Sequence, residues 1–81
     1  MKQSELKIMI MGDILESISL NSNHDQNEFF ISVVYFPTGK YADFYGTILT
    51  NNDGSSKTYT SLDRANQAIR KMGYKGTIEI K

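Results

Sequence analysis

The sequence predicts a small α+β domain whose clearest elements are a β-hairpin and a C-terminal helix. Two β-rich runs flank the turn residues 37–40, which indicates antiparallel strands over 29–36 and 41–50. Residues 61–73 carry apolar side chains at helical spacing. The chain has 81 residues, a length typical of one domain, so we expect a single globular unit over 1–81.

The hairpin prediction includes a register. A two-residue loop at 38–39 and a four-residue loop at 37–40 give the same pairing, in which partner numbers sum to 77. Because strand side chains alternate between faces, one face is apolar and is expected to be core: Phe29, Ile31, Val33, Tyr35, Ala42, Phe44 and Ile48. The other face is mixed: Phe30, Ser32, Val34, Phe36, Tyr41, Asp43, Tyr45 and Thr47.

The C-terminal half contains the best-defined helix. Thr60 or Ser61 can cap helix 61–73, and Gly73 is placed to end it in the left-handed conformation. Its inward side chains are expected to be Leu62, Ala65, Ile69 and Met72, which pack on the apolar sheet face. A turn-rich loop over 51–56 leads into a short strand at 57–60, expected to form a second hairpin with 41–50. A last strand over 77–80 would turn Ile78 and Ile80 inward.

The N-terminal segment 5–19 has two interpretations. A helical wheel collects its apolar residues on one side, which favours an amphipathic helix: Ile8, Ile10, Met11, Ile14, Leu15 and Ile18. The same segment also alternates as a strand would, and Gly12 costs a helix about 1 kcal/mol. With the helix, the predicted order is α-β-β-β-α-β around a small antiparallel sheet.

Composition excludes several classes of protein. With 40% hydrophobic and 22% charged residues the chain is globular rather than disordered. It contains no cysteine, which excludes disulfides and a thiolate zinc site and suits a cytoplasmic protein. The apolar run in 7–15 is too short and too soon interrupted to span a membrane, so no membrane partner is expected.

No residue pattern in the sequence is typical of an enzyme. The single histidine, His24, lies in a polar loop beside Asp25, and neither a nucleophile–base set nor a paired acid–base set is readable. His24, Asp25 and Glu28 have no spacing that is diagnostic of a metal site. We therefore expect a non-enzymatic binding protein without a metal or cofactor.

Charge is distributed unevenly along a chain whose formal net charge is zero. Residues 57–81 hold six basic groups against two acidic ones, whereas residues 1–28 hold two against five. The outward face of helix 61–73 and its flanks would form a basic ridge, which is the first candidate partner-binding site: Arg64, Gln67, Lys71, Lys57 and Lys75. Such a ridge suits an acidic protein surface or a site that normally holds phosphates; the alternative is a solvated face that binds nothing.

The mixed face of the hairpin is the second candidate surface. Its aromatic side chains, with Lys40 at the rim, could stack on nucleic-acid bases: Phe30, Phe36, Tyr41 and Tyr45. A neutral domain is at a disadvantage for a polyanion, because affinity for nucleic acid is mostly electrostatic. We therefore expect a protein partner first and a weak nucleic-acid-binding module as the alternative; the aromatic side chains could also be covered within the domain.

In size and architecture the chain resembles small accessory proteins of phages and other mobile elements, anti-CRISPR inhibitors among them. The resemblance is carried by a short, cysteine-free domain with sheet hairpins, one capped helix (YTSLDRANQAIRKMGY, 59–74) and no catalytic set. It implies a protein that binds a host complex by surface complementarity and inhibits or regulates it. No functional residue is carried over from these proteins, because they share no common motif.

Overall fold

Two helices and five strands follow one another in the computed structural model, which describes residues 1–23, 27–36 and 45–81. In chain order they are α1 (Gln3–Met11), β1 (Leu15–Asn23), β2 (Glu28–Tyr35), β3 (Tyr45–Ile48), β4 (Thr58–Tyr59), α2 (Leu62–Lys71) and β5 (Ile78–Ile80). The predicted α+β class is confirmed. The predicted turn at 37–40 and the side chains of Ala42, Asp43 and Phe44 lie outside the described residues.

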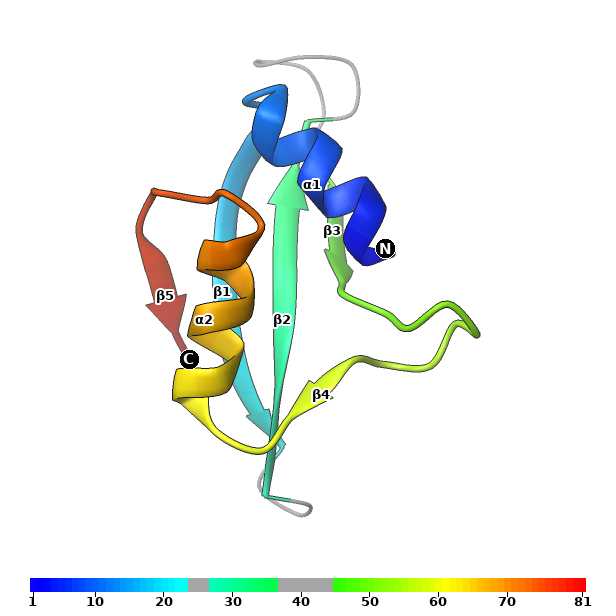
Figure 1. The fold of residues 1–81 in the computed structure, drawn as a ribbon, viewed down its shortest axis with the longest axis vertical. Coiled ribbons are helices and arrows are strands. Elements are labelled where there is room, and N and C mark those ends of the chain that lie inside the picture. Colours follow the sequence, from blue (N-terminus) through cyan, green and yellow to red (C-terminus); the bar gives the residue numbers. More distant parts are fainter. Residues whose placement is uncertain (24–26, 37–44) are drawn as a thin grey trace.

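The strands form one mixed sheet. Its order is β3-β2-β1-β5, and β4 pairs with β2 beyond the end of β3. β1–β2, β2–β3 and β2–β4 are antiparallel, but β5 runs parallel to β1. The predicted antiparallel sheet is therefore confirmed for β1 to β4, and the parallel pairing of β5 with β1 is the exception. The chain leaves β4 through α2, passes over the sheet and enters the edge beside β1 in the same direction as β1 (Figure 1).

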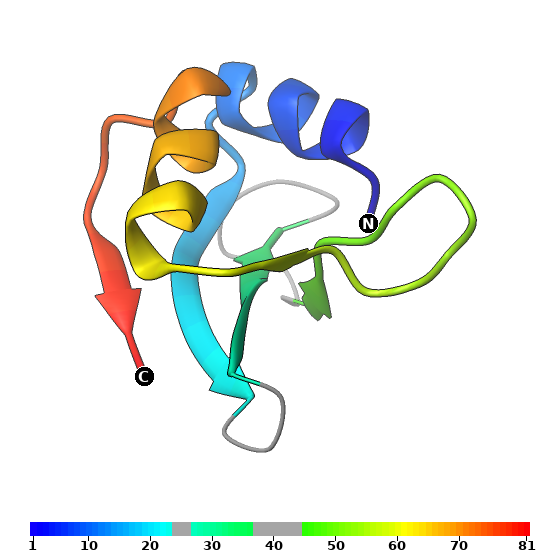
Figure 2. The same cartoon turned by 60° about the horizontal axis from the view of Figure 1, so that its bottom comes forward.

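Both helices cover the same face of the sheet, and the core lies between them and the sheet (Figures 1 and 2). Strand alternation puts Ile18 and Leu20 of β1 opposite Val33 and Ile31 of β2 on this face. All four side chains are buried, and they pack with one residue of α1 and the inward side of α2. The core residues are Leu6, Ile18, Leu20, Ile31, Val33, Leu49, Ala65, Ile69 and Met72.

The N-terminal segment is helix first and strand second. α1 ends at Gly12, and Asp13 takes a left-handed conformation with φ of 55° that turns the chain into β1. The predicted helix over 5–19 was therefore right only up to Met11, and the strand alternative holds from Leu15 onward. Ile18 and Leu20 are both in the core, whereas Ser19 between them is buried on the opposite face, where its hydroxyl is hydrogen-bonded to that of Ser32. The alternation of apolar residues with period two was therefore the correct signal there.

The predicted register of the central strand pair was wrong. β2 and β3 pair as Val33 with Thr47 and Tyr35 with Tyr45, so partner numbers sum to 80 instead of 77. An odd shift exchanges the faces of one strand, so Tyr45 lies on the face of Val33 and Ile48 on the face of Ser32. The observed register extends to Leu49, whose N–H donates to the carbonyl of Ile31. It buries Leu49 completely instead of Ile48.

Two further strand predictions need correction. The short strand expected over 57–60 is β4, but it pairs with Phe29 and Phe30 of β2. Its contact with the expected partner segment is limited to an isolated antiparallel bridge between Thr50 and Ser56 and the hydrogen bond from the Lys57 N–H to the Leu49 carbonyl. The last strand, expected over 77–80, is β5, and Ile78 is half-buried. Ile80 remains 68% exposed, and β5 is the edge strand of the sheet.

α2 confirms the helix prediction in its essentials. Ser61, rather than Thr60, is the N-cap and accepts a hydrogen bond from the Arg64 N–H. Gly73 follows with φ of 99°, the left-handed conformation expected of it. The helix itself spans Leu62–Lys71, slightly shorter than 61–73, and it turns Ala65 and Ile69 into the core. No helix in the described ranges is long and apolar enough to cross a membrane.

Candidate functional site: a basic groove between the helices

The outward side of α2 supplies the first wall of the site. Burial of Ala65 and Ile69 orients the helix, so Arg64, Gln67 and Lys71 are left exposed on the other side. These three side chains line one hollow of about 560 Å³ together with Ala68, Tyr59 of β4 and Gln3 of α1. Three residues of the predicted basic ridge therefore border a concave surface, not a convex one.

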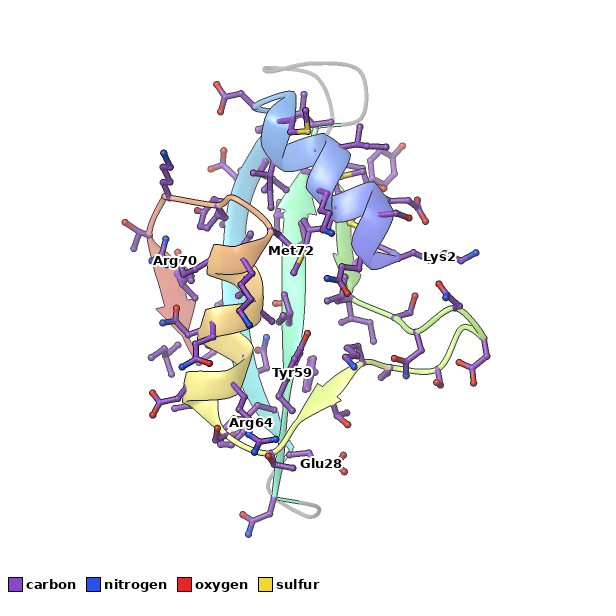
Figure 3. The ribbon with its side chains drawn as sticks, viewed as in Figure 1. Lys2, Glu28, Tyr59, Arg64, Arg70 and Met72 are labelled. Carbon is purple, nitrogen blue, oxygen red and sulfur yellow. The ribbon has the colours of Figure 1, made fainter. Side chains whose placement is uncertain are left out.

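β4 supplies the floor. Tyr59 pairs with Phe29 of β2, and its ring packs against the core from the side of α2. Figure 3 shows Tyr59 rising from β4 beside α2, with Arg64 at the N-terminal end of that helix. Lys57 precedes Tyr59 by two residues, and its Nζ lies 5.6 Å from the centre of the Tyr59 ring, a distance typical of a cation–π contact.

The N-terminus of the chain positions the opposite wall. The Met1 amino group donates to the Ile48 carbonyl, and the Thr50 N–H donates back to the Met1 carbonyl. These bonds fix the start of α1 beside the end of β3. They place Gln3, Ser4 and Lys7 next to the 49–57 segment, where a second hollow of about 380 Å³ opens.

The two hollows adjoin each other, and we call them together the basic groove. Gln3 lines both, and the contact between Lys57 and Tyr59 joins the floor of one to the floor of the other. The groove carries four cationic side chains: Lys7, Lys57, Arg64 and Lys71. No acidic side chain lines either hollow among the residues described.

The cations of the groove are not neutralised by acidic side chains of the described residues, and Lys57 contacts the Tyr59 ring. Within the described ranges of the chain none of the four forms an ion pair. Like any tyrosine, Tyr59 is protonated at neutral pH and its hydroxyl can donate a hydrogen bond, and burial raises the pKa of this phenol above its ordinary value. Together with the amides of Gln3 and Gln67, it adds neutral hydrogen-bonding groups to a cationic surface.

The remaining basic residues of the C-terminal half lie elsewhere. Lys75 borders a separate hollow with Ile10 and Asp13, so the structure does not bring it to the other members of the predicted ridge. Arg70 is engaged by its own segment: its Nη1 donates to the carbonyls of Tyr74 and Gly76 at 3.1 and 2.7 Å. The basic groove therefore contains every predicted ridge residue except Lys75, and Gln3 and Lys7 of α1 are added to it.

The predicted aromatic surface is not assembled on one face. In the observed register Tyr45 lies on the helix-bearing side, where its ring centre is 6.3 Å from that of Tyr35. Phe30 alternates to the opposite face of the sheet. Phe36 is half-buried just after β2, and Tyr41 and Lys40 are outside the described residues.

The groove presents cationic side chains and neutral hydrogen-bonding groups, which are suited to an anionic ligand. Among the described residues no three acidic or histidine side chains come together to hold a metal ion. Sequence reasoning missed Gln3, Lys7 and Tyr59, whose roles depend on where α1 and β4 dock. The signal that was available for Tyr59 is its place in the short strand two residues after Lys57. Comparison with known proteins finds no matching family, no matching curated protein and no matching solved structure.

Proposed function

We propose that this chain is a small non-enzymatic binding protein whose basic groove engages an acidic surface of a partner protein. The observation that carries the proposal is the groove itself: four cations and no acidic group around two adjoining hollows. Charge complementarity of this kind selects a partner and raises the rate of association. The half-buried Tyr59 ring adds an aromatic contact of the type that is enriched at protein interfaces.

A protein partner is favoured over a nucleic acid by two features. The formal net charge of the chain is zero, and a polyanion is held mainly by charge. Phe30 and Tyr45, which stacking on successive bases would need on one surface, lie on opposite faces.

The proposal also covers the biological role, because the chain resembles small accessory proteins of phages and other mobile elements in size and architecture. A domain of this kind acts by occupying a surface, so we propose an inhibitor or regulator of a larger complex, encoded by a phage or other mobile element. The cysteine-free composition makes the cytoplasm the proposed setting.

Charge reversal in the groove tests the proposed function. The partner is captured from the native host with the wild-type chain, identified by mass spectrometry and purified for titration. Arg64→Glu and Lys71→Glu, combined, are expected to weaken its binding at least tenfold, which corresponds to about 1.4 kcal/mol. Both residues are exposed, so the free energy of unfolding should change by no more than about 0.5 kcal/mol per site.

Lys75→Glu is the control, because it reverses one charge of the same sign outside the groove. It should leave the affinity for the partner within about twofold of wild type. If the double variant folds normally and binds its partner as tightly as wild type, the groove is only a solvated face and the proposed function is wrong.

A further inference from the structure

The outer edge of β5 has no strand paired with it in the described part of the sheet. The strand order ends at β5, and Figure 1 shows this strand at the margin of the molecule. The Lys81 N–H donates inward to the Leu20 carbonyl. Because successive residues of a strand direct their N–H and C=O groups to opposite edges, those of Ile80 point outward. This edge is a template for a further strand.

An apolar side chain and an apolar hollow lie side by side at this edge. Ile80 is 68% exposed on the helix-bearing face of the sheet. It borders a hollow of about 300 Å³ that it lines together with Leu20, Leu62 and Ile78, and with the polar residues Asp63, Asn66 and Arg70 of α2. The edge therefore presents an exposed isoleucine side chain at the border of a hollow that could receive an apolar side chain.

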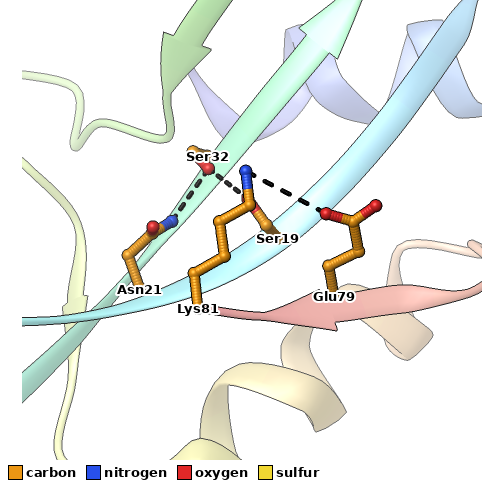
Figure 4. A network of polar contacts seen from close by, with 5 residues as sticks. All are labelled: Ser19, Asn21, Ser32, Glu79 and Lys81. Atoms are coloured by element: carbon orange, nitrogen blue, oxygen red, sulfur yellow. Dashed lines mark hydrogen bonds and ion pairs between the residues drawn. The ribbon is translucent and has the colours of Figure 1, made fainter.

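The opposite face of β5 carries one charge of each sign. Glu79 pairs with Ser19 of β1, and Lys81 follows two residues later on the same face. Figure 4 shows both side chains above β1, with the Lys81 Nζ 4.0 Å from a Glu79 carboxylate oxygen. Their side chains are 57% and 61% exposed, so both are accessible to a neighbour.

We propose that a second copy of this chain occupies the edge, with the two β5 strands antiparallel about a two-fold axis at Ile80. The N–H and C=O of Ile80 then exchange hydrogen bonds with those of Ile80 in the second copy. Each Ile80 packs on its counterpart at the mouth of the second hollow. Each Glu79 lies opposite Lys81 of the second copy, so one patch complements itself, as a two-fold interface requires.

The charges of Glu79 and Lys81 favour a two-fold axis at Ile80 over one at the adjacent residue. A two-fold axis at Glu79 would set the two Glu79 carboxylates directly opposite each other, and like charges opposite on a strand pair are destabilising. The axis at Ile80 replaces this repulsion by two attractive pairs. It also keeps the helices of both copies on one side of a continuous sheet, so the two basic grooves face the same way.

The edge is held in place before a second copy arrives. Arg70 donates to the carbonyls of Tyr74 and Gly76, and the Tyr74 hydroxyl donates to the Thr77 carbonyl. These bonds fix the connection from α2 to β5, so little conformational entropy remains to be lost on pairing. Because β5 has only three residues, the interface is small, and interfaces below about 1,200 Å² in total are weak. The dimer is a reversible one, formed at high protein concentration.

The experiment is sedimentation equilibrium of the full chain from micromolar to millimolar concentration. Wild type is expected to shift reversibly from monomer to dimer. Glu79→Lys alone and Lys81→Glu alone each oppose like charges and should remain monomeric. An equimolar mixture of these two variants pairs opposite charges at both positions and should dimerise, as should the double variant E79K/K81E.

Three results would overturn the proposal. Wild type could remain monomeric at millimolar concentration, both single variants could dimerise as wild type does, or their mixture could fail to associate. Circular dichroism verifies that each variant is folded. Ile80→Lys gives a second route that does not depend on the two charged positions: it puts like charges at the axis and is expected to abolish the dimer, so a dimer that persists in it also contradicts the proposal.

Discussion

Leu49 shows how one residue determines a strand register. It is fully buried, whereas Ile48, its neighbour, lies on the opposite face and is only half-buried. We predict that Leu49→Ala lowers the free energy of unfolding by about 2–5 kcal/mol, the usual cost of a large-to-small change in a core. Ile48→Ala is the matched control and should cost clearly less. Urea denaturation of both variants measures the difference, and the reverse order of cost would favour the register that sums to 77.

Tyr59 links the groove to the behaviour of the protein in alkali. Its burial raises the pKa of the phenol in the folded state above the value of about 10 that it has when unfolded. The contribution to stability is therefore fully present below about pH 10 and is lost as the pH rises through the folded-state pKa. We predict that the free energy of unfolding falls above about pH 10 and that this fall is smaller in Tyr59→Phe.

The measurement is urea denaturation at a series of alkaline pH values, beside a spectrophotometric titration of the tyrosines. In the titration, Tyr59→Phe should remove a phenol that ionises late. Wild type and Tyr59→Phe profiles that coincide above pH 10 would show that the ring is not desolvated in solution.

At the level of elements, the N-cap of α2 makes a discriminating test. Both Thr60 and Ser61 are capping residues by type, but only Ser61 accepts the bond from the Arg64 N–H, at 3.2 Å. We predict that Ser61→Ala lowers the free energy of unfolding by about 1 kcal/mol. Thr60→Ala is the control, since Thr60 is exposed and lies before the cap. Thermal unfolding of the two variants distinguishes the positions, and equal effects would contradict the cap assignment.

The elements differ in how much of them could be predicted from sequence. α2 was predictable because its apolar spacing, cap and terminal glycine all agree. The segment after Met11 was not, because Ile14, Leu15 and Ile18 fit a helical face as well as a strand. The register of β2 and β3 was not either, because a tight turn and the burial of Leu49 favour different pairings, and only the packing of Leu49 in the assembled core decides between them.

At the level of the whole molecule, the basic groove joins residues from opposite ends of the chain. The exposure of Arg64, Gln67 and Lys71 follows from the helical period alone. Their proximity to Gln3 and Lys7 does not, because it depends on the bonds that fix Met1 beside Ile48 and Thr50. A site assembled by tertiary contacts leaves only part of itself in any local pattern. The sequence therefore indicates Lys57, Arg64, Gln67 and Lys71 as candidates but not Gln3, Lys7 or Tyr59.

The last prediction concerns the class of partner. Cations concentrated in one groove attract acidic surfaces in general, and nucleic acid is the most acidic of them. The chain as a whole is nevertheless neutral, and its aromatic residues do not form one stacking surface. We predict no submicromolar binding to an unrelated single- or double-stranded oligonucleotide near physiological ionic strength, measured by fluorescence anisotropy.

Salt and charge reversal make this prediction decisive. Each phosphate contact releases counterions, so a nucleic-acid complex weakens steeply as salt rises, whereas a protein interface with an apolar centre tolerates moderate salt. Any oligonucleotide binding seen at low salt should therefore vanish near physiological salt. A submicromolar, salt-sensitive complex that Arg64→Glu with Lys71→Glu abolishes and Lys75→Glu preserves would instead assign the groove to phosphate backbones.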